Sequence, residues 1–109
     1  MLGHMLVRVL SPHHRVIGTT SSKYNSESPL ARILSEKDWI DQIDVRNIST
    51  AELAISTTKP DVVINCVGVI KQKMESSNIM DAILINSLVP HQLANLCEAA
   101  GCRFIHFST

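Results

Sequence analysis

The chain has 109 residues, which is enough for one small domain. Its 45% of hydrophobic and 18% of charged residues are typical of a globular protein and exclude a disordered scaffold. Ten basic residues balance ten acidic ones, so the charge indicates neither nucleic acid nor anionic lipid as a partner. No apolar run reaches the roughly 18 residues that cross a bilayer, and no signal peptide is recognised, so we expect a cytoplasmic protein without a membrane partner.

The three cysteines, Cys66, Cys97 and Cys102, form neither a CxxC pair nor an even set. This pattern is typical of buried free thiols in a reducing cytoplasm. The neighbouring histidines His13 and His14 lie far from every cysteine in the sequence. Because a zinc site needs clustered ligands, we expect no metal.

The first 44 residues predict one helix and two strands. Residues 3–10 carry apolar side chains on one face and predict a helix that ends before Pro12. Residues 15–20 are rich in β-formers and predict a strand, after which the polar residues 21–29 predict a surface loop. A short strand is expected at residues 39–43.

A helix and a buried strand are predicted next. Ser49 and Glu52 have the spacing of a capping box, in which each side chain accepts a backbone N–H near the other residue. The helix that they begin should end at about Thr58. Residues 61–68 follow with a mainly apolar run that lacks alternation, which predicts a strand buried on both faces of a parallel sheet.

Residues 78–100 predict a long helix with an apolar stripe. Pro90 removes one backbone donor inside it, so we expect a kink or break near residues 86–89. Gly101 is suited to end this helix, and residues 103–108 predict the last strand.

Alternation of helices and strands predicts an α/β fold with a doubly wound parallel sheet of the Rossmann type. In that strand order the first strand lies between the second and the fourth. The sequence begins on the helix, so we interpret residues 1–109 as a partial dinucleotide-binding domain. Residues 15–20 and 61–68 would lack their common neighbour, and the chain alone is expected to fold poorly.

Ligands of open α/β sheets bind beyond the carboxyl ends of the strands, which makes the residues there the candidates for a site. Gly68 suits a close approach of backbone to ligand, and equally a simple turn. Asn65 is better explained as a polar clamp between loops. His91 and His106 are interpreted as ordinary core or surface histidines, while Asn86 could reach the crevice or cap the helix near Pro90.

Four segments, residues 1–6, 59–68, 85–93 and 103–109, together resemble the extended short-chain dehydrogenase/reductases. Within these they are most similar to the sugar-nucleotide reductases typified by dTDP-4-dehydrorhamnose reductase. The resemblance covers the whole chain. It implies the cofactor-binding portion of an NAD(P)H-dependent reductase that acts on a nucleotide-activated 4-keto-deoxysugar in cell-surface polysaccharide biosynthesis.

The resemblance also implies residue roles. Gly3 resembles the last glycine of a GxxGxxG turn at the cofactor pyrophosphate. Thr20 stands where NAD-preferring relatives have an acidic residue, and Ser21, Ser22 and Lys23 follow, so NADP is slightly favoured over NAD. The complete set implied to bind the cofactor is Met1, Leu2, Gly3, Thr20, Ser21, Asp44, Val45, Cys66, Val67 and Gly68.

Ser108 and Thr109 resemble the beginning of the family's Ser-Thr-Asp segment, and Thr109 would be the catalytic residue that binds the substrate carbonyl. The Tyr-x-x-x-Lys pair that supplies the proton is absent from this sequence. We therefore interpret the chain as a fragment truncated at both ends and inactive alone.

Two alternatives remain open, a non-catalytic dinucleotide-binding module or redox sensor, and an epimerase or dehydratase of the same superfamily. A homodimer is compatible with the sequence, which leaves the oligomeric state and the sugar undetermined.

Overall fold

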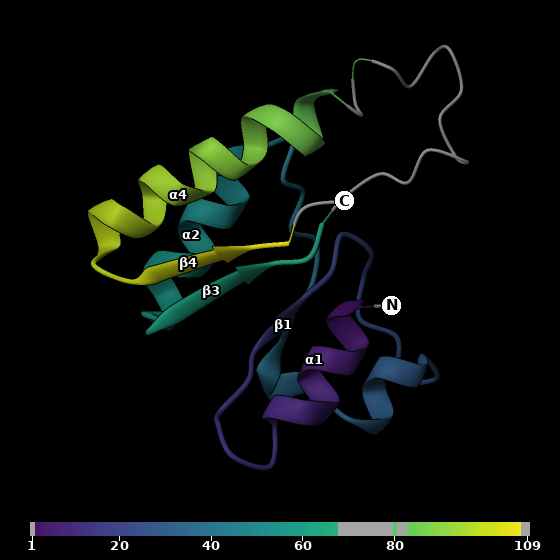
Figure 1. The fold of residues 1–109 in the computed structure, drawn as a ribbon. Helices are drawn as coiled ribbons and strands as arrows, with labels where there is room; N and C mark the ends of the chain where they lie inside the picture. Colours follow the sequence, from purple (N-terminus) through teal and green to yellow (C-terminus); the bar gives the residue numbers. More distant parts are fainter. Residues whose placement is uncertain (1, 68–79, 81–82, 108–109) are drawn as a thin grey trace. The chain divides into compact units, whose positions relative to one another are not determined.

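The computed structural model describes residues 2–67, 80 and 83–107. The chain divides into two compact units, Met1–Asp44 and Val45–Thr109. Each unit contains a two-stranded parallel sheet and at least one helix (Figure 1). The predicted α/β class with parallel strands is confirmed.

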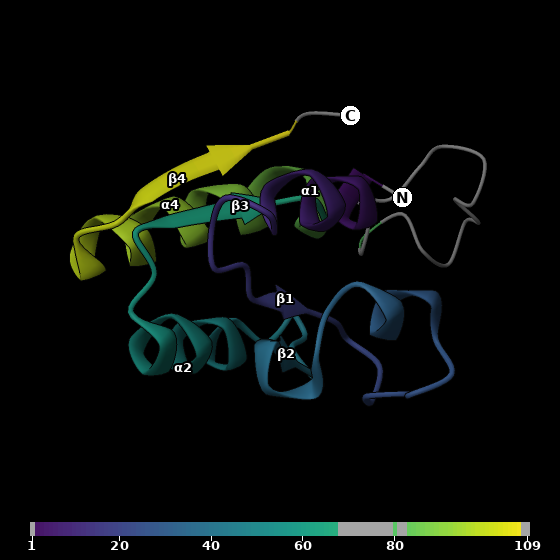
Figure 2. The ribbon, with the colours of Figure 1, turned by 90° about the horizontal axis from the view of Figure 1, so that it is seen from below.

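The first unit contains the three elements that the sequence predicts there. Helix α1 spans Leu2–Leu10, strand β1 spans Gly18–Thr19 and strand β2 spans Trp39–Ile40. Between the strands lie two short 3-10 helices, η1 at Pro29–Arg32 and η2 at Glu36–Asp38. Gly18 pairs with Trp39 in parallel register, and Figure 2 shows the two short strands side by side.

A small core holds the first unit together. Four residues, Val7, Leu30, Leu34 and Trp39, are buried in it. The ring of Tyr24 meets that of Trp39 edge to face, with 4.7 Å between the ring centres. An aromatic pair and three aliphatic side chains thus connect α1, the 3-10 turns and β2.

The second unit begins with helix α2 at Ile48–Thr58 and strand β3 at Val62–Asn65. The π-helix η5 at Leu84–Leu88 leads into helix α4 at Val89–Ala100, and strand β4 spans Arg103–His106. Strands β3 and β4 are parallel, and α4 packs against both α2 and β4. Val89, Leu93 and Cys97 are the buried residues of α4.

The predicted capping box at the start of α2 is wrong. The N-cap is Asn47 rather than Ser49, and its side chain accepts no capping hydrogen bond. Because the helix begins earlier than predicted, Ser49 lies inside the first turn, where its hydroxyl donates to Oδ1 of Asn47 over 2.6 Å. The other end agrees with the prediction, since α2 ends at Thr58 with a left-handed Lys59 before Pro60.

The predicted burial of strand β3 on both faces is also wrong. Val62 is 42% exposed, Val63 and Ile64 are half-buried, and only Asn65 is buried. Among the described strands β3 pairs with β4 alone, and β1 pairs with β2 alone. With a single neighbouring strand, β3 is less covered than the central strand of a larger sheet.

The predicted break near residues 86–89 is confirmed as a π-helical turn. Pro90 has no N–H for the carbonyl of Asn86, and in an α-helix its ring would collide with that carbonyl. The chain widens into η5 just before this position and continues as a regular helix from Val89. Gly101 ends α4 with a φ of 78°, as predicted.

The remaining expectations concern membranes and thiols. No helix in the described part of the chain is both long and apolar enough to span a bilayer. The three cysteines are free thiols, of which Cys97 is buried and Cys66 and Cys102 are half-buried.

Candidate functional site

In the first unit the candidate site lies at the carboxyl ends of β1 and β2. Because the two strands are parallel, these ends meet at one edge of the sheet. The backbone N–H of Thr20 donates to Ile40 over 3.1 Å, and Ile43 donates back to the carbonyl of Thr20 over 2.9 Å. Asp44 follows Ile43 directly, so two of the predicted cofactor positions, Thr20 and Asp44, lie close to the same edge.

The hydroxyl of Thr20 has two partners inside the protein. It accepts a hydrogen bond of 2.8 Å from Nε1 of Trp39 and donates one of 2.9 Å to the carbonyl of Ser22. Ser21, Ser22 and Lys23 beyond it are exposed. This edge therefore presents no carboxylate at Thr20, but two serines and a lysine that are accessible to an anion.

The sequence did not single out the residues that shape this edge. Oδ2 of Asp41 accepts the backbone N–H of Tyr24 over 2.7 Å, which ties the loop after β1 to the loop after β2. Gln42 has a φ of 58°, an uncommon value for a residue other than glycine, and its N–H donates to Ser22 over 3.4 Å. The predicted strand at 39–43 could have pointed to Asp41, but no local signal marks Gln42.

The start of helix α1 provides a second feature of the first unit. Helix α1 begins at Leu2 with Gly3 in its first turn and has no acidic residue there. The first N–H groups of a helix lack partners within it and favour an anion such as a phosphate. Leu2 and Gly3 are thus suitably placed for the predicted role. Met1, Gly68 and Thr109, which carry related predictions, lie outside the described residues.

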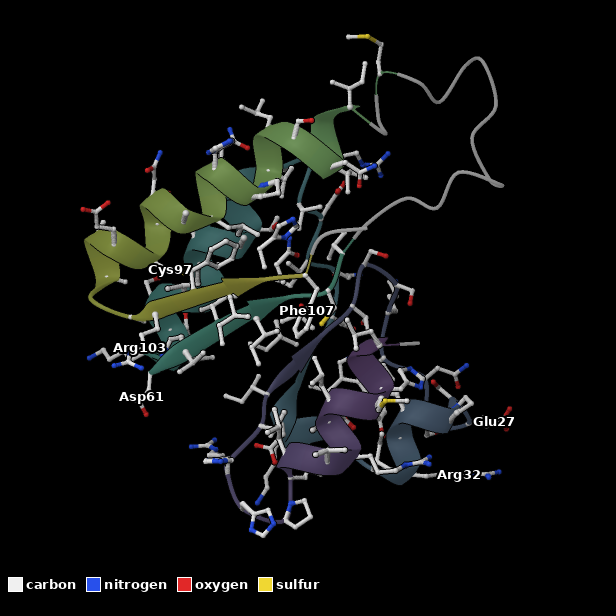
Figure 3. All side chains as sticks on the ribbon, in the orientation of Figure 1. Glu27, Arg32, Asp61, Cys97, Arg103 and Phe107 are labelled. Carbon is white, nitrogen blue, oxygen red and sulfur yellow. The ribbon has the colours of Figure 1, made fainter. Side chains whose placement is uncertain are left out.

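In the second unit the corresponding edge is formed by the residues after β3 and β4. Cys66 and Val67 follow β3, and Phe107 follows β4. Figure 3 shows Phe107 at the opposite end of this sheet from Asp61 and Arg103, where the two strands begin. Val45, the remaining predicted position, is half-buried at the start of this unit. Burial raises the pKa of the Cys66 thiol, which therefore stays neutral at physiological pH.

Asn65 links the two strand ends. Its Oδ1 accepts the N–H of Val67 over 3.1 Å, and its backbone carbonyl accepts that of Phe107 over 3.3 Å. Its amide nitrogen lies 3.1 Å from Nδ1 of His106. The predicted polar clamp at Asn65 agrees with these contacts, and His106 is one of its partners.

A hollow of about 560 Å³ also opens in this unit. Its lining combines polar and apolar groups from η5, the first turn of α4 and the end of β4. These residues are Asn86, Ser87, Leu88, Pro90, His91 and His106. Asn86 is one of the lining residues, and both of the roles that the sequence left open for it stay predictions.

These features fit a dinucleotide in separate parts. The start of α1 suits the pyrophosphate, and the polar edge at Thr20–Lys23 suits a ribose or its phosphate. Within the second unit, taken by itself, Cys66 and Val67 stand at a carboxyl edge of parallel strands, where nucleotides bind in open α/β sheets.

Comparison with known proteins identifies the family of this chain. The model of the NAD dependent epimerase/dehydratase family matches residues 1–109. The chain belongs to this family. The predicted membership of the short-chain dehydrogenase/reductase superfamily is confirmed at the level of this family, and the NAD dependence of the family supports a nicotinamide cofactor.

One known protein is similar to this epimerase/dehydratase family member in sequence, and one solved structure is similar to it in fold. The "Probable low-salt glycan biosynthesis reductase Agl14" of Haloferax volcanii is 29% identical over 110 residues, which cover 100% of the chain and 34% of that protein. Among solved structures, the carbonyl reductase Sniffer of D. melanogaster superposes with a TM-score of 0.57 at 20% identity, over 91% of the chain and 46% of Sniffer. The chain thus spans about a third of the glycan reductase and about half of Sniffer. At 20% identity, the likeness to Sniffer shows a shared fold and nothing more.

Proposed function

We propose that the chain is the cofactor-binding portion of an NAD(P)H-dependent reductase that acts on a nucleotide-activated 4-keto-deoxysugar. The reaction would resemble that of dTDP-4-dehydrorhamnose reductase and would serve the biosynthesis of a cell-surface polysaccharide. The observation that carries the proposal is the pairing of the β3 and β4 ends, where Asn65 holds Val67 and Phe107 together. The likeness to a protein named as a glycan biosynthesis reductase supports the substrate class.

Each predicted residue has a role in this proposal. The pyrophosphate is bound by Met1, Leu2 and Gly3, and the ribose by Thr20 and Ser21. The adenine is held by Asp44 and Val45. The loop that passes beneath the cofactor contains Cys66, Val67 and Gly68. When bound, the nicotinamide supplies the hydride. Thr109 donates a hydrogen bond to the carbonyl oxygen of the sugar, which helps to hold that carbon for reduction. The free thiols favour a reducing compartment, the cytoplasm.

The first unit supports NADP over NAD. An acidic residue that accepts the ribose hydroxyls would repel a 2′-phosphate, and Thr20 carries no charge. Its hydroxyl accepts from Trp39 and donates to Ser22, so it can offer the ribose only its second lone pair. The ammonium group of exposed Lys23 can pair with the phosphate instead.

The test uses the full-length gene product. Titration calorimetry with NADPH and NADH is expected to show binding of both, with NADPH the tighter ligand. Addition of dTDP-4-dehydrorhamnose is then expected to consume NADPH, followed by loss of its fluorescence, with formation of an equal amount of reduced sugar. A protein that binds neither dinucleotide contradicts the proposal at its first step.

A second candidate is favoured by the family match itself, because that family includes epimerases and dehydratases. Both reactions return the nicotinamide to its starting state, so they convert a nucleotide sugar without net consumption of cofactor. Product analysis with a catalytic amount of cofactor separates them from a reductase, which requires one equivalent for each sugar. Binding without turnover of any nucleotide sugar would instead indicate a non-catalytic dinucleotide module.

A further inference from the structure

Asn65 is the one buried polar side chain among the residues that the structure describes, with 4% of its surface exposed. A buried amide is destabilising unless its donors and acceptor are paired. Asn65 is the last residue of β3 and lies in register with His106, the last residue of β4. Its contacts therefore act at the point where both strands pass into the loops of the candidate site.

The contacts determine how the amide is oriented. The N–H of Val67 can only donate, so the amide atom that faces it over 3.1 Å must be the oxygen. The other amide atom, 3.1 Å from Nδ1 of His106, is then the NH₂ nitrogen, which also can only donate. Nδ1 must therefore be an acceptor without a proton, and the neutral ring carries its proton on Nε2.

Hydrogen bonds to Asn65 hold the first residues after both strands. Val67 is 42% exposed and Phe107 is 39% exposed, so their side chains are only partly packed. Both donate a backbone N–H to Asn65, Val67 to the side chain and Phe107 to the main chain. The conformation of the Val67 backbone thus depends on an amide whose own orientation depends on His106.

We propose that Asn65 and His106 are a positioning pair that sets the backbone of Cys66 and Val67 for the cofactor. This inference rests on the proposed function, because it assigns these two residues to the beginning of the cofactor loop. Neither member of the pair needs to contact the dinucleotide. Both act through the hydrogen bond that Asn65 accepts from Val67.

The sharpest variant is Asn65→Asp in the full-length gene product. It keeps the shape of the side chain and an oxygen for Val67, but it places a second oxygen against Nδ1 of His106. The imidazole must then carry a proton on Nδ1. We expect ¹⁵N NMR of the ring nitrogens to show the Nε2–H form in the wild type and a protonated Nδ1 in the variant. The carboxylate still accepts the N–H of Val67, so NADPH should bind about as tightly as it does to the wild type.

A pair of substitutions at His106 tests the same link from the other side. His106→Gln offers a side-chain oxygen to the amide of Asn65 and should keep affinity for NADPH close to that of the wild type. His106→Leu removes the acceptor and should weaken NADPH binding roughly tenfold, the effect of losing about one well-placed hydrogen bond. Because His106 is exposed, both proteins should fold even if a change at buried Asn65 is not tolerated. Asn95→Asp, at an exposed position of α4, is the charge-matched control and should change neither binding nor the tautomer.

The possible results separate this inference from the function on which it rests. A wild-type His106 with its proton on Nδ1 overturns the pair, whatever the protein binds. Unchanged affinity for NADPH in His106→Leu overturns the positioning role but leaves the proposed function intact. A wild-type protein that binds neither NADPH nor NADH overturns the proposed function, and the link between the pair and the cofactor with it.

Discussion

The indole N–H of Trp39 donates a hydrogen bond of 2.8 Å to the hydroxyl of Thr20. It joins the first residue of β2 to the first residue after β1. Trp39 is 7% exposed, so few water molecules can replace this partner. Thr20, which the family resemblance assigns to the cofactor ribose, thus also holds the core residue Trp39 in place.

Removal of this hydrogen bond should destabilise the protein. We expect Thr20→Val and Trp39→Phe each to lower the free energy of unfolding by about 1 to 3 kcal/mol in urea denaturation. Because they remove the same interaction, the double variant should lose about 1 kcal/mol less than the sum of the two. Additivity within about 0.5 kcal/mol would show that the two side chains act independently.

Most elements of the fold could be predicted from local patterns. Pro90 and Gly101 each restrict the backbone in a way that depends on one residue, and both the break before α4 and its end occur as expected. The start of α2 could not be predicted as well, because Asn47 and Ser49 are both good N-caps and the choice depends on how the helix packs. The burial of β3 depends on its neighbours in space, which its own sequence does not contain.

Gly18 shows a packing constraint that the sequence did not reveal. A Cβ at this position would lie 2.6 Å from Cδ2 of Leu34, whose side chain is buried. We expect Gly18→Ala to lower the free energy of unfolding by about 1 to 3 kcal/mol, as for other overpacked cores. In the Leu34→Ala background the same change should cost less, because the clashing methyl group is gone. An equal cost in both backgrounds would exclude this contact as the cause.

The ends of α2 and α4 offer a matched comparison. Both helices end at a left-handed residue, Lys59 with a φ of 49° and Gly101 with a φ of 78°. Nothing lies within 4 Å of a Cβ built on Gly101, so Gly101→Ala should cost about 1 to 2 kcal/mol through backbone strain alone. Lys59→Gly relieves the same strain and should raise the free energy of unfolding by about 0.5 to 1 kcal/mol, less than the full strain because glycine also favours the unfolded chain. Equal signs of the two effects in urea denaturation would contradict this account.

Cys97 should make stability fall at alkaline pH. Burial, followed by a hydrogen bond with Cys102, raises the pKa of the Cys97 thiol from 9.0 to about 11. Between these values the unfolded chain loses the proton that the folded protein keeps, so the free energy of unfolding falls as pH rises, by up to about 1.4 kcal/mol per pH unit. The contribution is complete below about pH 9 and lost above about pH 11.

Cys97→Ala separates this effect from the titration of other groups. The variant is less stable at neutral pH, because it leaves a small cavity beneath α4, but its free energy of unfolding should fall less steeply than that of the wild type between pH 9 and 11. Urea denaturation across this pH range measures both slopes. Parallel curves for the two proteins would show that Cys97 does not ionise differently on unfolding.

The position of Cys66 and Val67 could be predicted, because it depends only on the strand before them. The family resemblance assigned both residues to the cofactor loop, and in the structure they follow β3 at the edge where Phe107 follows β4. The link between Asn65 and His106 joins residues 41 positions apart, so it depends on strand register and was not visible in the sequence. The hydrogen bond from Trp39 to the hydroxyl of Thr20 could not be predicted for the same reason, because it also joins residues of two different strand regions.

The choice of cofactor can be tested at Lys23, which is exposed just beyond the strand end at Thr20. A lysine that pairs with the 2′-phosphate contributes to NADPH binding but not to NADH binding. Lys23→Ala should therefore raise the Kd for NADPH roughly tenfold and leave the Kd for NADH nearly unchanged, as expected for loss of one charge-assisted hydrogen bond. Lys37→Ala removes an exposed lysine of η2 in the same unit and is the control for net charge, measured by the same calorimetry. If Lys23→Ala weakens both dinucleotides equally, Lys23 binds a group that they share, and the preference for NADP loses its support.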